Sequence, residues 1–312
     1  MLPLDAAFMT LDLAPASFPP AVSVRAAADH EARACRLLLP EMFDAHQAPE
    51  LLVAVLHDKE APEKSRLVGA AGIAPGYGPG RGSALLVHVT PSFRRRGVGR
   101  ALIEAAVASC RGRSAVLRAL RPVPEESQAA QFLAACGFER IDRIVHFEVD
   151  GLPFYADILA VRQRLESHRR IPQNARIVKL CDADPDAVTD LVCRSIETSR
   201  AYVRSRFRRD CANPYDTQNS VVLKVDDEVR GALIYNWSGG APMIEVRAVD
   251  SSLRGSWANA LMLEEATRNA KERGALRFRF FASDKLTETM SLARRAHADE
   301  IRIELQYARP VR

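Results

Sequence analysis

The hydrophobic and polar residues of this chain alternate with two periods, which predict strands and helices in turn. Apolar residues run almost without interruption over 84–89, as in a buried strand, and recur at helical spacing over 101–106. The strand is expected to end at Pro91, which cannot donate a hydrogen bond to a neighbouring strand. The turn between this strand and the helix reads Arg94-Arg95-Arg96-Gly97-Val98-Gly99-Arg100.

Residues 21–150 follow one continuous alternation of elements. The pattern predicts strands at 21–26, 51–56, 67–73, 84–89, 115–120 and 140–149, and helices at 30–43, 101–111 and 125–135. A loop rich in proline and glycine is expected at 75–80. Residues 1–20 contain two aspartates and four prolines and lack a basic leading segment, so they predict an irregular leader and not a signal peptide.

The second half of the chain repeats the first. A connecting helix is predicted within 151–174. Strands are expected at 176–180, 221–225, 229–235 and 244–249. Helices are expected at 184–197 and after the turn at 250–259, where a long helix ends at about 273. Without a gap, Val89 aligns with Val249 and Arg94 with Arg254, 160 residues further on. The chain is therefore predicted to be an α/β protein with mixed sheets, in two tandem domains at 21–150 and 175–312.

Composition narrows the class of protein without naming its chemistry. The 312 residues suit two domains of about 150 residues each. The formal net charge of +5 is small for a nucleic-acid binder, so we expect an anionic cofactor or acidic substrate instead. The six cysteines form no C-x-x-C pair and the histidines do not cluster, so no metal site is expected and the thiols are expected to be reduced. No segment approaches the length of a membrane span.

The glycines of the turn give it a specific chemistry. Glycine at the start of a helix leaves the first backbone N–H groups uncovered, and these groups, the helix dipole and nearby arginines can hold a pyrophosphate. The spacing fits neither a Walker loop nor a dinucleotide fingerprint, because no Gly-Lys-Ser/Thr follows and a third glycine is missing. The pattern V-x-P-x-x-[QR]-x-x-G-x-[GA] is met at every position, by Val89, Pro91, Arg94, Gly97 and Gly99.

That pattern resembles the acyl-CoA-binding signature of the GNAT superfamily of N-acyltransferases, and the element order over 21–150 resembles the GNAT order. The resemblance implies that acetyl-CoA is the acyl donor. It also implies that the backbone at 87–89 holds the thioester carbonyl and the pantetheine arm, much as an added strand pairs with a sheet edge. The residues expected to bind this cofactor are Val87, His88, Val89, Arg94, Arg95, Arg96, Gly97, Val98, Gly99, Arg100 and Phe132.

The second copy departs from the signature. Gly97 aligns with Trp257 and Gly99 with Asn259. A tryptophan there would fill the space of the pyrophosphate, so the domain at 175–312 is predicted to keep the fold and to have lost the CoA site. The other interpretation is that Trp257 packs beneath a shifted turn that still binds. Two-domain members of the superfamily, mycothiol synthase among them, resemble this pairing of one active and one degenerate domain.

Candidate catalytic residues come from the central strand of the first domain. His88 titrates near neutrality, and it is either a general base or a packed, hydrogen-bonded residue. Ser83 is too weak a base alone and could only position a water molecule. Many family members place a tyrosine in the next helix to protonate the leaving thiolate, and this position is Leu133 here. Cys136 stands beside a helix-ending glycine, which favours core packing over a nucleophilic role.

The segment 202–209 interleaves aromatic residues with arginines. Three interpretations are open for it: a solvated helix face, a wall for an anionic substrate, and an RNA-binding surface. We expect the first of these.

These observations predict an N-acetyltransferase whose first domain transfers acetyl from acetyl-CoA to a primary amine of a small molecule or peptide, by direct attack. We expect a cytoplasmic protein without a metal, a membrane partner or a nucleic-acid partner. Whether it forms a homodimer is left open by the sequence. The alternative is a non-catalytic CoA-binding sensor or scaffold. Leu133 and the altered second copy favour that alternative, whereas the intact first turn favours the enzyme.

Overall fold

Contacts in a computed structural model of the protein divide the chain into two compact units. The structure describes residues 22–43, 48–57, 65–75, 82–196, 198, 200–208, 211, 214–238 and 240–312. The N-terminal unit comprises the chain up to Arg143 together with Glu304–Arg312, and the C-terminal unit comprises Ile144–Ile303. The predicted leader at 1–20 and most of the predicted loop at 75–80 lie outside the described residues.

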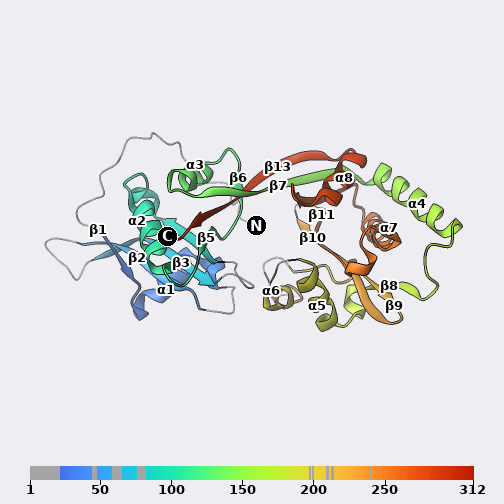
Figure 1. The fold of residues 1–312 in the computed structure, drawn as a ribbon, viewed down its shortest axis with the longest axis horizontal. Coiled ribbons are helices and arrows are strands. Elements are labelled where there is room, and N and C mark those ends of the chain that lie inside the picture. Colours follow the sequence, from blue (N-terminus) through green and yellow to red (C-terminus); the bar gives the residue numbers. More distant parts are fainter. Residues whose placement is uncertain are drawn as a thin grey trace. The chain divides into compact units, whose positions relative to one another are not determined.

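The N-terminal unit is a sheet with helices on both faces, drawn from blue to green in Figure 1 except for its dark red C-terminal segment. Strands β1 to β5 are neighbours in chain order; β1 to β4 pair antiparallel, and β4 pairs parallel with β5. The strands are β1 (Val22–Ala26), β2 (Glu50–Leu56), β3 (Arg66–Pro75), β4 (Ser83–Val89), β5 (Val116–Ala119) and β6 (Val123–Pro124). The helices are η1 (Asp29–Glu31), α1 (Ala32–Leu38), η2 (Pro40–Phe43), η4 (Pro91–Phe93), α2 (Val98–Cys110) and α3 (Gln128–Ala135).

The elements predicted for residues 21–150 are confirmed, with one change in the first helix. The segment predicted as a helix over 30–43 is the short helix α1 flanked by the 3-10 turns η1 and η2. Pro40 explains the change, because proline disfavours helical backbone in the residue before it, and Leu39 accordingly leaves the helical region at φ −132° and ψ 53°.

Side chains alternate between the two faces of β4, and the faces have different neighbours. Leu86 packs with Leu39, which connects α1 to η2, and with Met42 of η2. Val89 lies under α2, since a Cβ at Gly99 would be 3.5 Å from its Cγ2 atom. Odd-numbered residues of β4 therefore face α2, and even-numbered residues face α1 and η2.

The C-terminal unit repeats this arrangement. Its strands are β7 (Glu139–Asp150), β8 (Ala175–Lys179), β9 (Val221–Val225), β10 (Glu228–Ser238), β11 (Ala241–Val249), β12 (Arg277–Ser283) and β13 (Asp299–Pro310), of which β7 and β13 each cross the boundary between the units. Its helices are α4 (Gly151–Ser167), η5 (Leu180–Asp182), α5 (Pro185–Ser195), α6 (Arg200–Ser205), η6 (Ser251–Leu253), α7 (Trp257–Glu272) and α8 (Thr287–Arg295). The connecting helix predicted within 151–174 is α4, and it contacts α7.

Two apolar clusters cover opposite faces of the second sheet. Leu233 and Val249 belong to the cluster that includes Met262 of α7, whereas Ile234 and Ala248 belong to the one that includes Leu191 of α5. Because neighbouring residues of one strand fall into different clusters, β10 and β11 are buried on both sides. This sandwich of a sheet between helices is the same as that of the N-terminal unit.

The last strand of each unit does not come from the expected half of the chain. Residues 144–150 of β7 pair antiparallel with β12 in the C-terminal unit, and Phe147 stacks on Phe280 at 5.2 Å. Residues 308–310 of β13 pair antiparallel with β5 in the N-terminal unit. The predicted boundaries at 21–150 and 175–312 follow the chain, whereas the contacts give each unit a strand segment from the other half of the sequence.

The arginine- and aromatic-rich segment 202–209 is a folded part of the C-terminal unit up to Arg208, where its described part ends. Arg206 is buried, donates to Glu245 of β11 at 2.5 Å, and lies over the ring of Tyr215 at 5.1 Å. The expectation of a solvated helix face is therefore wrong for Arg206, because its charge is neutralised inside the unit. The expectation holds for Arg204, which is exposed and forms an ion pair with Asp186.

The returning C-terminal strand should stabilise the N-terminal unit through Arg309. Its guanidinium donates to Glu104 of α2 at 2.7 Å and to the carbonyl of Cys136, just after α3, at 2.8 Å. We expect Arg309→Ala to lower the free energy of unfolding by about 1–2 kcal/mol, measured by denaturant titration. The exposed Arg66, changed to alanine as a control, should cost less than about 0.5 kcal/mol. Equal effects of the two variants would contradict this role.

Candidate active site

Strands β4 and β5 separate part of the way along their length. Their parallel ladder pairs Ser83 with Leu117 and ends where Leu85 meets Ala119, and the Leu120 amide donates to the Leu85 carbonyl at 2.8 Å. Backbone groups of alternate residues point to the same side of a strand, so the N–H and C=O of Val87 and the N–H of Val89 face the open edge. An extended ligand can supply partners to backbone groups that a sheet leaves unpaired in this way.

The turn after β4 holds the next helix in place with its first turn open. Thr90 donates from both its amide and its hydroxyl to the Val68 carbonyl of β3, at 2.9 and 3.0 Å. Arg95 and Gly97 then adopt left-handed backbone, with φ of 67° and 78°. In the residue before α2, Gly97, there is no side chain to cap the helix, and the amide of Ala101 donates to the Gly97 carbonyl. The earlier N–H groups of α2 therefore stand ready for an anion.

Four arginines surround this turn and differ in what they contact. The Nε of Arg94 donates to the carbonyl of Val89 at 3.0 Å, which fixes the end of β4. Arg96 lies over the ring of Phe93 at 5.6 Å, and Arg100 donates to the Ala135 carbonyl at the end of α3 at 3.1 Å. Arg95 is exposed. The turn therefore combines positive charge with the open helix start.

Helix α3 closes against the first turn of α2 through Phe132. A Cβ at Gly99 would lie 2.9 Å from the Cζ atom of Phe132, closer than real Cβ contacts allow. Glycine at this position thus has a packing role beside the phosphate-binding role expected from the sequence. Phe132, expected from the sequence among the CoA-binding residues, lies at the turn.

His88 lies on the opposite face of β4 from α2. It pairs with Ala70, whose side chain belongs to the cluster around Cys35, Leu39 and Met42. Burial lowers the pKa of His88, the charge of Arg94 lowers it further, and the carboxylate of Glu41 acts in the opposite direction. The imidazole is therefore neutral near pH 7 and able to accept a proton.

Two charged residues near this face were not expected from the sequence. Glu41 of η2 acts on the charge of His88 and forms an ion pair with Arg121, with 3.1 Å between Oε1 and Nη2. Arg121 comes two residues after the end of β5. No motif marks either residue, because it is the folding of η2 against the sheet that brings them together.

Ser83 and Cys136 lie away from the open edge. Ser83 stands in the paired part of β4, and its side chain is hydrogen-bonded to the buried Cys110 thiol. We therefore propose no catalytic role for Ser83. Burial raises the pKa of the Cys136 thiol, so it is protonated, in keeping with the core role expected for it. Leu133 is partly buried in α3 and has no proton to give.

The corresponding turn of the C-terminal unit keeps the backbone and closes the helix start. The 3-10 turn η6 lies 160 residues after η4, and Gly255 has a φ of 66° where Arg95 has 67°. Helix α7 begins at Trp257, and the hydroxyl of Ser256 accepts from the Ala258 amide at 3.3 Å. Trp257 itself packs against the apolar cluster of the unit. The Ser256 hydroxyl thus takes up one of the N–H groups at the start of α7, and the loss of the CoA site in this unit stays a prediction.

Two further properties concern ligands and membranes. Among the described residues, no group of three or more His, Cys, Asp or Glu side chains is placed to hold a metal ion. None of the helices in the described part of the chain combines the length and the apolar character needed to cross a bilayer.

Comparison with known proteins identifies the family of the first unit. Residues 16–138 match the model of the acetyltransferase (GNAT) family, which generally uses acyl-CoA as a substrate. No curated protein sequence matches the chain. The N-terminal unit is thus a GNAT acetyltransferase domain, as its signature predicted.

Solved structures with the same fold span nearly the whole chain. A GCN5-related N-acetyltransferase from Sphaerobacter thermophilus is 14% identical with a TM-score of 0.54, over 95% of this chain and 98% of that one. A tandem GNAT protein from the clavulanic acid biosynthesis pathway is 18% identical with a TM-score of 0.53, over 93% and 99%. A probable N-acyltransferase from Enterococcus faecalis V583 is 12% identical with a TM-score of 0.62, over 93% and 73%. These likenesses confirm the predicted fold of two tandem GNAT domains.

The contact between Gly99 and Phe132 can be tested by stability alone. We expect Gly99→Ala to lower the free energy of unfolding by about 1–3 kcal/mol, because the new methyl group overlaps the Phe132 ring. In the Phe132→Leu background, where the ring is gone, Gly99→Ala should lower the free energy of unfolding by less than it does in the wild type. Purely additive effects in this double-mutant cycle, measured by denaturant unfolding, would show that the two residues do not compete for space.

Proposed function

We propose that this member of the GNAT superfamily transfers an acetyl group from acetyl-CoA to a primary amine of a small molecule or peptide, with its N-terminal unit as the active domain. One observation carries the proposal: the open edge of β4 leads directly into a helix whose first N–H groups are uncapped. An extended ligand with an anionic end matches this combination, and an acyl-CoA is such a ligand.

The two parts of the site suit two parts of the cofactor. The N–H groups of Val98, Gly99 and Arg100, with the exposed Arg95 beside them, would bind the pyrophosphate. The backbone of Val87 and Val89 would hold the pantetheine arm and the thioester carbonyl as a further strand does. The carbonyl of Val89 is already taken by Arg94, which leaves its N–H for the ligand.

The acceptor would approach from the face of β4 that carries His88. The amine nitrogen attacks the thioester carbon, a C–N bond forms, the C–S bond breaks, and CoA leaves as the thiolate. His88 takes the proton that the amine loses, directly or through water, because its lowered pKa keeps it neutral. A CoA thiol has an acidity close to that of cysteine, so the thiolate can leave without the tyrosine that Leu133 replaces.

A second candidate function is a CoA-binding sensor without catalysis. Leu133 favours it, because the helix that carries a proton donor in many relatives offers none here. Both functions require acetyl-CoA at the same turn, and they differ in whether CoA is released when an amine is present. The six free cysteines suit the reducing cytoplasm, where we place the protein.

Acetyl-CoA binding tests the first step of both candidates. Calorimetric titration should find one site per chain, and Gly97→Trp should weaken binding by more than about tenfold because the side chain covers the helix start. Gly112→Trp is the matched control, since Gly112 also has a positive φ, lies just beyond the other end of α2 and has open space around it. A wild-type protein that binds no acetyl-CoA would refute both candidates. Two sites per chain would refute the prediction that the C-terminal unit has lost its CoA site.

The pH dependence of CoA release tests the role of His88. As the base, His88 must be neutral, so kcat/KM should fall as the pH drops through its pKa, which is lowered from the usual value of about 6.5. We expect His88→Ala to reduce kcat by about 100-fold and to remove this acidic limb. The exposed His168, changed to alanine, should leave the profile as it is. If His88→Ala keeps the wild-type profile, His88 is not the base.

A further inference from the structure

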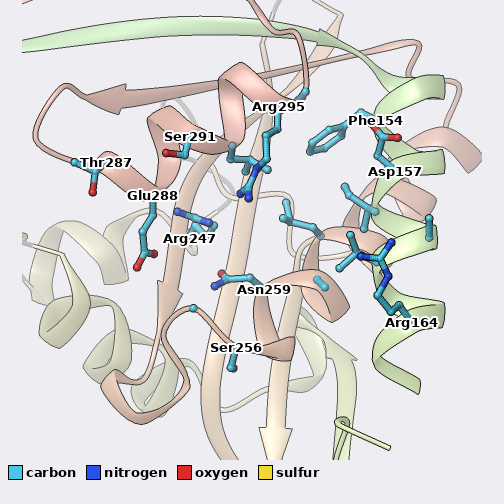
Figure 2. Close-up of a pocket in the computed structure, with 18 residues that line it drawn as sticks. Phe154, Asp157, Arg164, Arg247, Ser256, Asn259, Thr287, Glu288, Ser291 and Arg295 are labelled. Carbon is cyan, nitrogen blue, oxygen red and sulfur yellow. The ribbon is translucent and has the colours of Figure 1, made fainter. Parts of the chain in front are cut away.

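A cavity of about 780 Å³ lies in the C-terminal unit among α4, α7 and α8 (Figure 2). A second hollow of about 530 Å³ adjoins it and reaches β11 and β12, and the two share Arg247, Asn259 and Leu263. These volumes are in the range of small-molecule sites in proteins. We call the two hollows together the C-terminal cleft.

The C-terminal cleft is the counterpart of the open edge in the N-terminal unit. Strands β11 and β12 pair in parallel at Met243 and Ile244, as β4 and β5 do, and the ladder ends there. Arg247 follows beyond the end of the ladder, 160 residues after Val87. The cleft thus lies at the same place in the fold as the open edge of the N-terminal unit, but different residues line it.

The altered lining does not suit an acyl-CoA. Ser256 occupies an N–H of the helix that would bind the pyrophosphate. The backbone position that an uncharged pantetheine arm would follow carries the long charged side chain of Arg247, which lines both hollows. A different class of ligand must match these groups.

The groups that converge in the cleft are cationic and short of partners. Arg247 is partly buried and donates to the Thr289 hydroxyl at 2.6 Å, and burial lowers the pKa of its guanidinium. Among the described residues, no carboxylate forms an ion pair with it. Figure 2 shows the side chain of Arg295 pointing into the same space, and the buried Oδ1 atom of Asn259 has no hydrogen-bond partner.

Three acidic residues line the cleft and leave this charge uncompensated. Glu245 is engaged by Arg206 and by Asn236, with 2.5 and 2.7 Å between the partners. Glu288 is exposed; its charge acts on Arg247 without an ion pair between them, and in Figure 2 its carboxylate points away from Arg295. Asp157 lies on α4, on the other side of the cavity. A partly buried guanidinium that forms no ion pair with a carboxylate is costly unless an anion joins it.

We propose that the C-terminal cleft binds a small organic molecule that carries one oxyanion group, a carboxylate or a phosphate, next to an apolar body. The oxyanion pairs with Arg247 and Arg295, because a guanidinium donates two parallel hydrogen bonds to such a group. The apolar body lies against Phe154, Ile158, Leu263 and Leu292, which line the same cavity. This site is separate from the acetyl-CoA site of the N-terminal unit and goes beyond the function proposed for it.

Calorimetry on the full chain with three probes tests the site. 4-Phenylbutyrate and phenyl phosphate carry the two oxyanions, and neutral 4-phenylbutyramide is the matched control. We expect at least one anion to bind at one site per chain, and the amide to bind at least about tenfold more weakly. Failure of both anions to bind at millimolar concentration, or equal binding of the amide, would overturn the proposal.

Four variants locate the binding. Arg247→Leu and Arg295→Ala should each weaken the anion at least about tenfold, whereas Arg294→Ala, the exposed neighbour on α8, should not. Gly97→Trp should keep the anion site while losing acetyl-CoA. Because Arg295 is exposed, its variant tests the site even if Arg247→Leu fails to fold. Unchanged anion binding in Arg295→Ala would overturn the proposal. So would acetyl-CoA binding that persists in Gly97→Trp and is lost when Arg247→Leu is added.

Discussion

The candidate active site depends on a single break in strand pairing. Hydrogen bonds join β4 to β5 up to Leu85 and then stop, although β4 continues to Val89. Between helices on both faces, backbone groups without partners carry a free-energy cost that only water or a ligand can remove. The turn that follows extends the same logic, since Gly97 leaves the helix start uncapped. The strand edge and the helix start thus each present backbone N–H groups to a ligand.

The two units show how little must change to alter such a site. They share the break in pairing, the 3-10 turn and the left-handed residue after it. They differ at the helix start, where a hydroxyl in the C-terminal unit caps an N–H that glycine leaves free in the N-terminal unit. A helix terminus can be satisfied by its own chain or by an anion, and one side chain decides between them.

The sequence predicted the features that depend on local pattern. The elements over 21–150, the glycine turn and the 160-residue repeat follow from periodicity and spacing, which neighbouring residues along the chain determine. It did not predict the exchange of strand segments, because residues 144–150 and 304–312 have the pattern of ordinary final strands whichever unit they join. Glu41 and Arg121 were missed for a related reason: their meeting depends on how η2 packs, and no spacing encodes that contact.

The second copy shows what the structure adds to the interpretation of aligned substitutions. Aligned on the signature, Trp257 suggests a blocked site, yet its side chain packs against the core and Ser256 closes the helix. The change with the larger chemical consequence lies on the strand, where Arg247 replaces the aligned Val87. A valine beside the break suits an uncharged ligand arm, whereas an arginine brings a charge that the Thr289 hydroxyl alone does not neutralise. A fold that keeps such a group beside a cavity carries its desolvation cost in every unliganded molecule, and an oxyanion in the cleft removes that cost.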